Sequence, residues 1–211
     1  MLMTEERIIE IFKEHDAFWT YTGGPHAELT SGLCSNAYFN LSKVLCKPIL
    51  VEALARALCQ KLNQAGTEEN PPDWVVGSAY AAITFSYEVA KQLGADHAFA
   101  EKTPVSHKMS FKRVEIPKDA LVLQVEELIT TMDTANAVRN AIVCDNPHPV
   151  NFFPFVGTIV YRPSKLDKNS CRIVALTKRL VWSVPPNECP LCRAGSPRFR
   201  PKEYWNKLTQ R

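Results

Sequence analysis

Apolar residues recur at the spacing of an α-helix in four segments of the chain. The first segment begins near Thr4, and its apolar positions lie on one side of the predicted helix. Pro48 suits the first turn of a second helix, in which leucines at every fourth position form one stripe. Two further helices are predicted over about 83–93 and 135–143. Glycines follow the second and third helices, as is typical of helix ends.

Short apolar runs between these helices predict β-strands. They cover 74–77, 97–100, 120–125, 156–161 and 172–176. Because strands alternate with helices, the chain is predicted to have an α/β fold with a mostly parallel sheet flanked by helices. Ligands bind beyond the carboxyl ends of the strands in such sheets. Functional residues are therefore expected in the segments 77–84, 126–134 and 162–164.

Composition narrows the class of protein. With 211 residues, 45% of them hydrophobic and 22% charged, the chain can form one domain with a sizeable core. The net charge of +3 is too small to indicate nucleic-acid binding. No apolar run approaches the roughly 20 residues of a membrane helix, and the charged first residues do not resemble a signal peptide. Seven scattered cysteines then indicate reduced thiols in a cytoplasmic protein.

The segment 121–134, LVLQVEELITTMDT, carries the most chemistry. A buried strand leads into the adjacent acids Glu126 and Glu127, and the hydroxyls of Thr130, Thr131 and Thr134 open a helix. Hydroxyls and backbone N–H groups at a helix N-terminus suit a phosphate. Two carboxylates before them suit ribose hydroxyls or a magnesium shell. The alternative is that the acids cap the helix and the threonines form a polar turn.

With its neighbours, this segment resembles the phosphoribosyl-diphosphate motif of type I phosphoribosyltransferases, and among them the orotate phosphoribosyltransferase family. Further matches follow the order of that family. LTSGLCS (29–35) and YFN (38–40) resemble its orotate-binding segment, and VVGSAYAAI (75–83) resembles its diphosphate loop. FAEK (99–102) through MSFKR (109–113) resembles its mobile catalytic loop, and YRPS (161–164) the position of an arginine that contacts orotate. The tail segments ECPLC (188–192) and GSP (195–197) match some members.

The resemblance implies one phosphoribosyltransferase-like domain, with a core over about 45–180. A small hood would be formed by the N-terminal segment 18–44 and the C-terminal tail 181–211. The implied reaction transfers ribose 5-phosphate from 5-phosphoribosyl 1-diphosphate to a pyrimidine base, converting orotate to orotidine 5′-monophosphate. It implies Mg²⁺ bound mainly through the substrate. A homodimer is also implied, in which the mobile loop of one subunit covers the site of the other.

The resemblance also assigns roles to single residues. Thr130, Thr131 and Thr134 would bind the 5′-phosphate, and Glu126 and Glu127 the ribose hydroxyls. Tyr80 and Ala81 would contact the diphosphate through backbone N–H groups, while Lys102 and Arg113 would act from the mobile loop. Phe39 would stack on the pyrimidine, and Arg162 would pair with its carboxylate.

The chain departs from the family pattern at both phosphate loops. Met132 and Asp133 stand where glycines are usual, so a side chain is expected in the phosphate space and a negative charge beside it. Ser78 stands where proline is common, and Ala81-Ala82 where small flexible residues are common. These departures keep open an alternative, a catalytically impaired member of the fold that binds a nucleotide or a protein partner.

The tail carries two weaker signals. Cys189 and Cys192 have metal-ligand spacing, but a structural zinc site needs two more ligands. No second pair of ligands is evident, although Cys34, Cys46, Cys59 or a histidine could come near in space, so two ordinary thiols are favoured and no metal ligand is predicted. Basic and aromatic residues of the tail suggest RNA contact, but a strap or a subunit interface is favoured.

Overall fold

The computed structural model describes residues 3–104, 108–163 and 172–209 and has an α/β fold. Its central sheet has six strands in the order β10-β9-β8-β5-β6-β7. These are β5 (Trp74–Ser78), β6 (Asp96–Lys102), β7 (Met109–Ser110), β8 (Leu121–Ile129), β9 (Asn151–Tyr161) and β10 (Arg172–Lys178). All neighbours pair in parallel except β7, which is antiparallel to β6. The predicted fold class, a mostly parallel sheet, is confirmed.

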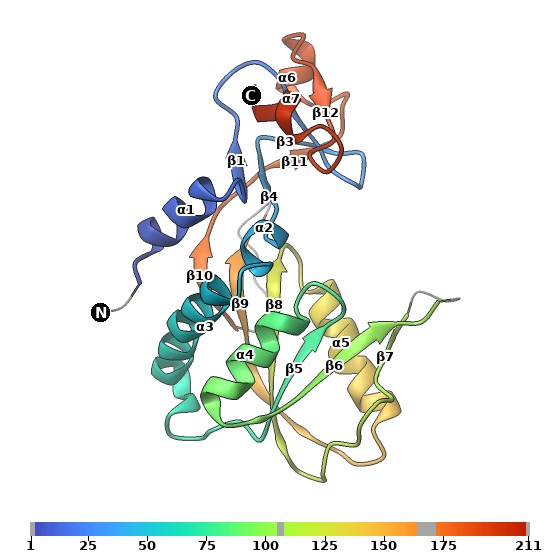
Figure 1. Cartoon of the computed structure of the whole chain (residues 1–211). Coiled ribbons are helices and arrows are strands. Elements are labelled where there is room, and N and C mark those ends of the chain that lie inside the picture. The colour runs from blue at the N-terminus through green and yellow to red at the C-terminus, as the bar shows by residue number, and fades with distance from the viewer. Residues whose placement is uncertain (1–2, 105–107, 164–171, 210–211) are drawn as a thin grey trace.

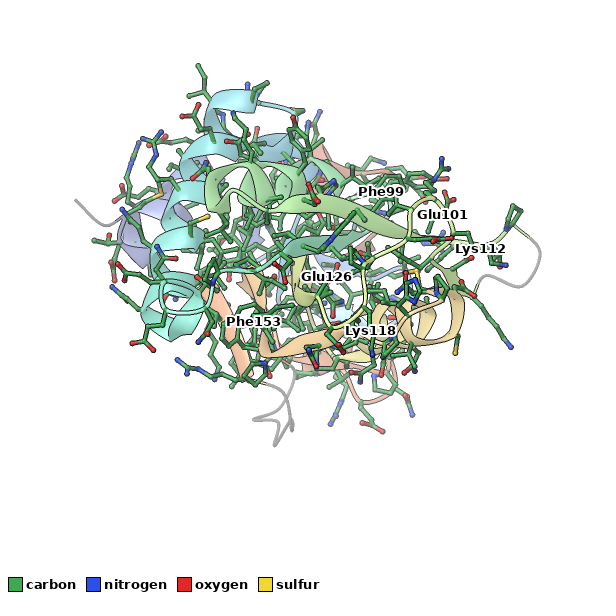
Figure 2. The ribbon with its side chains drawn as sticks, turned by 90° about the horizontal axis from the view of Figure 1, so that it is seen from below. Phe99, Glu101, Lys112, Lys118, Glu126 and Phe153 are labelled. Carbon is green, nitrogen blue, oxygen red and sulfur yellow. The ribbon has the colours of Figure 1, made fainter. Side chains whose placement is uncertain are left out.

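Helices cover both faces of this sheet. Apolar residues of α1 (Glu5–Glu14), α3 (Pro48–Leu62) and α4 (Ile83–Leu93) share one core cluster with β8, β9 and β10. The second cluster joins α5 (Asp133–Asp145) to the opposite side of β5 and β8. Seen from below, α3 and α4 lie on one side of the sheet and α5 on the other (Figure 2). Within the described residues, none of the helices has the length and apolar composition that crossing a membrane would require.

The ends of these helices follow local sequence signals. The N–H of Arg7 donates to the hydroxyl of Thr4, the N-cap of α1, and Pro48 occupies the first turn of α3. After α3 comes a five-residue π-helical turn (Asn63–Thr67), which contains Gly66 at φ 128°. Gly94 ends α4 with φ 71°, a left-handed conformation that glycine adopts without steric cost.

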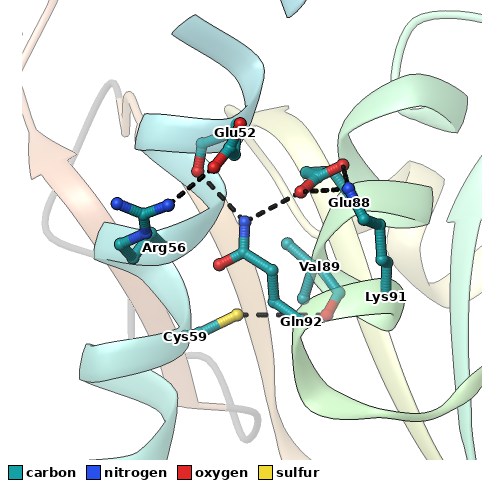
Figure 3. A network of polar contacts seen from close by, with 7 residues as sticks. All are labelled: Glu52, Arg56, Cys59, Glu88, Val89, Lys91 and Gln92. Carbon is teal, nitrogen blue, oxygen red and sulfur yellow. Dashed lines mark hydrogen bonds and ion pairs between the residues drawn. The ribbon is translucent and has the colours of Figure 1, made fainter. Parts of the chain in front are cut away.

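Polar contacts join α3 to α4 above the sheet (Figure 3). The amide of Gln92 donates to the backbone oxygen of Glu52 at 3.1 Å and to the carboxylate of Glu88 at 3.0 Å. Lower down, the Cys59 thiol lies 3.9 Å from the backbone oxygen of Val89. These contacts fix α4, and therefore the loop that precedes it, against the rest of the core.

Strands from both ends of the chain form a second, smaller sheet. Its order is β11-β3-β2-β12, with β2 (His26–Glu28) and β3 (Cys34–Ser35) from the N-terminal part and β11 (Ser183–Val184) and β12 (Arg198–Phe199) from the tail. Another two-stranded antiparallel sheet is formed by β1 (Phe18–Thr20) and β4 (Ala37–Phe39). The remaining short helices are α2 (Ser42–Leu45), α6 (Pro190–Arg193) and α7 (Trp205–Thr209). Figure 1 shows β3, β11, β12, α6 and α7 gathered at one end of the molecule, above the central sheet.

The central strands β8 and β9 extend well beyond the ranges that the sequence predicts. β8 continues through both acids to Ile129, so Glu126 and Glu127 lie within a strand rather than in the turn before α5. β9 begins at Asn151 and contains Pro154, at an irregularity where the register with β8 shifts between Val122 and Gln124. A proline is tolerated there because its missing N–H falls where regular pairing is interrupted.

Candidate active site

The carboxyl ends of four parallel strands meet at one edge of the central sheet. Ser78, Lys102, Ile129 and Tyr161 end β5, β6, β8 and β9. The segments singled out from the sequence therefore leave the sheet side by side, as the parallel topology requires. Ser164, at the end of the third segment, lies outside the described residues.

The first segment makes a tight turn between β5 and α4. The Cβ of Ser86 and the backbone oxygen of Ala82 lie 2.9 and 3.3 Å from where a side chain would begin at Gly77. Only glycine fits this approach of α4 to β5. The N–H of Ala79 donates to Ala100 of β6 at 2.7 Å, and the Ala79–Tyr80 peptide bond is cis. Tyr80 is 84% exposed and Ala81 is exposed, so their backbone is open to a ligand.

Glu126 is buried beneath this turn. Its carboxylate accepts hydrogen bonds from the Ser78 hydroxyl at 2.5 Å and from the Gln124 amide at 3.1 Å. Arg139 of α5 donates in turn to Gln124 at 3.2 Å. Burial raises the pKa of Glu126 to about 7, although the hydrogen bonds from Ser78 and Gln124 favour its charged form. Ser78, where proline is common in the family, thus binds the first acid of the phosphate segment.

Glu127 points away from Glu126, because successive side chains of a strand alternate. Burial raises the pKa of Glu127, and the positive charge of Lys202 opposes this rise. Burial also raises the pKa of Tyr38, helped by Glu127 and opposed by Arg162, while burial lowers the pKa of Arg162. The four side chains, which come from β8, β4, the loop after β9 and the tail, therefore lie close enough to interact electrostatically.

A cavity of about 200 Å³ lies beside this group. It is lined by Glu28, Thr30, Tyr38, Arg200, Pro201, Lys202 and Glu203. The local sequence does not predict Lys202 or Arg200 as site residues, because they lie in the tail, far along the chain from residues 28–38. The family resemblance assigns the base contact to Phe39, the neighbour of Tyr38. The Phe39 ring is buried, stacked on Phe18 at 4.5 Å and edge-on to Phe12 at 6.2 Å. The structure therefore does not bring Phe39 into this group.

The phosphate segment keeps its hydroxyls at the surface. Thr130 is half-buried, whereas Thr131 and Thr134 are exposed. Met132 is buried in a cluster with Ile129, Ala135, Val156 and Tyr161, so the expectation that it fills the phosphate space is wrong. The φ of Met132 is −85°, a value open to any residue, so this turn does not need glycine.

Asp133 has the other consequence that the sequence predicts. Asp133 begins α5, where the helix dipole favours a negatively charged side chain. The Thr131 hydroxyl donates to this carboxylate at 2.8 Å. A negative charge therefore lies on the loop and engages one of the hydroxyls assigned to the phosphate.

The basic residues assigned to the mobile loop lie near β6 and β7. The Arg113 guanidinium makes two hydrogen bonds to Glu101, at 3.0 and 3.1 Å, and lies 5.5 Å from the centre of the Phe99 ring. Figure 2 labels Glu101 and Phe99 along β6. Lys102 lines a hollow of about 530 Å³ with Asp133 and Thr134. Lys102 and the first turn of α5 thus face a common space.

Comparisons with known proteins agree with this geometry. No protein-family model matches the chain. The orotate phosphoribosyltransferase of Desulforamulus reducens is 32% identical over 200 residues, which cover 94% of this chain and 97% of that protein. The orotate phosphoribosyltransferase of Aeropyrum pernix has a similar structure, with a TM-score of 0.61 and 17% identity over 81% of this chain and 93% of that one. A UMP synthase from Leishmania donovani gives 0.58 and 15%, over 81% of this chain but only 35% of that chain.

The fold and the arrangement of loops at the sheet edge define a type I phosphoribosyltransferase fold. The identity to the Desulforamulus reducens protein extends along almost the whole length of both chains. The chain belongs to the orotate phosphoribosyltransferase family.

The pKa of Glu126 predicts how stability depends on pH. Its pKa of about 7 lies above the ordinary 4.5, so the folded state holds a proton that the unfolded state releases. The contribution of protonated Glu126 to the free energy of unfolding is complete below pH 4.5 and is lost as the pH rises to about 7. The gap corresponds to roughly 3 kcal/mol. Glu126→Gln cannot ionise, so its free energy of unfolding relative to the native chain should rise by about that amount over this range.

Urea unfolding at several pH values measures this difference. Glu69→Gln, a change at an exposed surface position, is the control and should show no such trend. A constant difference between Glu126→Gln and the native chain would contradict the assignment of a raised pKa to Glu126.

Proposed function

We propose that this chain transfers ribose 5-phosphate from 5-phosphoribosyl 1-diphosphate to orotate, forming orotidine 5′-monophosphate and diphosphate. The main support is that three parts of the molecule meet at one edge of the sheet. They are the threonine-bearing segment 130–134, the exposed turn at Tyr80 and Ala81 (the diphosphate turn), and the side chains of Tyr38 and Arg162. Family membership supports the same reaction.

In the proposed reaction, the bond from the ribose anomeric carbon to diphosphate breaks and a bond to the base nitrogen forms. That nitrogen loses its proton, which the departing diphosphate can accept. Diphosphate leaves with the bonding electrons, so its charge must be neutralised as it departs. The backbone N–H groups of Tyr80 and Ala81 and the ammonium of Lys102 are suited to this. Tyr80 lies close enough to contribute to the raised pKa of Arg113, which is caused mainly by its pairing with Glu101. We infer that Arg113 exchanges Glu101 for diphosphate when the substrate binds.

The other residues hold the two substrates in place. Thr130, Thr131 and Thr134 are proposed to bind the 5′-phosphate at the N-terminus of α5. Glu127, the more accessible acid, is proposed to accept hydrogen bonds from the ribose hydroxyls, while Glu126 positions the diphosphate turn through Ser78. Arg162 is proposed to pair with the carboxylate of orotate, and Tyr38, in place of the buried Phe39, to contact its ring.

The acids at this edge fit a substrate-borne Mg²⁺. Glu126 is only 4% exposed and already accepts two hydrogen bonds, so Glu127 offers the accessible carboxylate. Mg²⁺ commonly binds through one or two carboxylates together with phosphate oxygens and water. The ion would neutralise charge on the diphosphate. A homodimer and a cytoplasmic location stay predictions from the sequence.

Arg162→Ala tests the proposed orotate contact. Losing a charge-assisted pair to the carboxylate should raise the KM for orotate about 10- to 100-fold and change the KM for 5-phosphoribosyl 1-diphosphate little. Initial rates of orotidine 5′-monophosphate formation measure both constants, and Arg56→Ala, on the exposed side of α3, serves as the control. An unchanged KM for orotate would remove Arg162 from the site. A native chain without product formation would refute the proposed function and favour the impaired alternative.

Asp133→Asn tests the effect of the charge on the phosphate loop. Removing a negative charge beside a phosphate should lower the KM for 5-phosphoribosyl 1-diphosphate by about three- to tenfold, a modest change because Asp133 is exposed. The gain should shrink as salt is added. Asp96→Asn, at the end of β6 away from Lys102, also removes one negative charge and should leave this KM unchanged. An equal KM for Asp133→Asn and the native chain would show that Asp133 turns away from the bound phosphate.

A further inference from the structure

Three cysteines and one histidine converge inside the smaller sheet. His26 begins β2, Cys34 begins β3, Cys189 is the N-cap of α6 and Cys192 lies within α6. One potential ligand atom from each lies within 4.8 Å of all the others. In the described part of the chain, this is the only such group of three or more His, Cys, Asp or Glu residues. Two ligands come from each end of the chain.

We propose that His26, Cys34, Cys189 and Cys192 bind one zinc ion, which ties the tail to the N-terminal part of the hood. Tetrahedral zinc, with bonds of about 2.3 Å to sulfur and 2.0–2.1 Å to nitrogen, holds two sulfurs about 3.8 Å apart and a sulfur and a nitrogen about 3.6 Å apart. The Cys34 and Cys192 sulfurs are 3.6 Å apart. The His26 Nε2 atom lies 3.5 Å from the Cys192 sulfur and 3.7 Å from the Cys189 sulfur.

The hydrogen bonds of His26 leave the correct nitrogen free for a metal. The Ser196 hydroxyl donates to the backbone oxygen of Gly24 at 2.6 Å, so at His26 it acts as an acceptor. The His26 Nδ1 atom lies 2.7 Å from this hydroxyl oxygen and must therefore carry the proton. The Nε2 lone pair then points at the sulfurs. An outer partner that fixes the tautomer in this way is typical of histidines that bind metals.

Two of the sulfurs accept hydrogen bonds from nearby donors. The N–H of Cys192 donates to the Cys189 sulfur at 3.5 Å, within the turn of the Cys-x-x-Cys pair. Arg198 donates to the Cys34 sulfur at 3.9 Å. Three thiolates and Zn²⁺ would carry a net charge of −1, which the guanidinium of Arg198 offsets. Since Cys34, Cys189 and His26 are fully buried, the cluster also excludes water.

The chemistry of the ligand set selects zinc and a structural role. Three sulfurs and one imidazole in a tetrahedral arrangement are typical of closed zinc sites, which have no open position for a substrate. The chain continues from Cys192 to Arg200 and Lys202, which line the cavity beside Tyr38. The ion would therefore hold the tail over the cavity beside Tyr38. The zinc site does not depend on the proposed reaction and can be tested without measuring it.

Elemental analysis of the full-length chain, purified after growth in zinc-supplemented medium, tests the proposal. One zinc per chain is expected, and Cys144→Ser, which changes an exposed thiol outside the cluster, should keep it. Cys34→Ser and Cys192→Ser should each lose most of the zinc. Ser196→Ala keeps all four ligands but removes the partner of the imidazole, together with the hydrogen bond to Gly24. This variant should fold and bind zinc about 10- to 100-fold more weakly.

Cobalt provides a second measurement that needs no variant. After zinc is removed under reducing conditions, titration with Co²⁺ should give the intense visible bands of tetrahedral thiolate coordination, saturating at one ion per chain. Zinc below about one ion per ten chains together with no cobalt bands would overturn the proposal. A disulfide between Cys34 and Cys192 would also overturn it, and would appear as a mass lower by two hydrogens that reverts on reduction, with peptide mapping that joins these two cysteines.

Discussion

The parallel pairing of β5 with β8 is the constraint on which the candidate active site depends. This pairing sets the diphosphate turn beside the strand that leads to the phosphate loop. At the end of the pair, the Ser78 hydroxyl donates to the buried carboxylate of Glu126, so the turn and the acid hold each other in place. Burial keeps the pKa of Glu126 near 7, because ionising it would leave a charge beneath the loop. The loops on both sides can then vary while their relative position is preserved.

The departures from the family pattern affect the site unequally. Met132 replaces a glycine at a position with an ordinary φ, and its side chain turns into the apolar cluster below the loop. This substitution therefore preserves the backbone that a phosphate would contact. Asp133 keeps the helical geometry but adds a charge that competes for the Thr131 hydroxyl. The balance between an active and an impaired transferase therefore lies in electrostatics rather than in the shape of the loop.

Much of this could be predicted from sequence, because helical and strand periodicities are local. The helix predicted over 83–93 matches α4, and the segment with Glu126 and Glu127 lies at the predicted sheet edge. The family resemblance implied that segment 18–44 and the tail lie together, but which of their residues meet could not be predicted. His26 and Cys189, 163 residues apart, come together only because the tail pairs with β2, and the same pairing brings Lys202 toward Glu127. Phe39 was predicted to contact the base, but its ring is buried in the core. The pattern of one short strand does not show which of two adjacent rings faces the core.

We propose that the altered phosphate loops still form one binding site at the sheet edge. Calorimetric titration of the purified chain with 5-phosphoribosyl 1-diphosphate and Mg²⁺ tests it most directly, because binding does not require the base or turnover. We predict one saturable site per chain with micromolar affinity. The absence of detectable binding in the presence of Mg²⁺ would contradict the claim, and would mean that Asp133 and the diphosphate turn close the site.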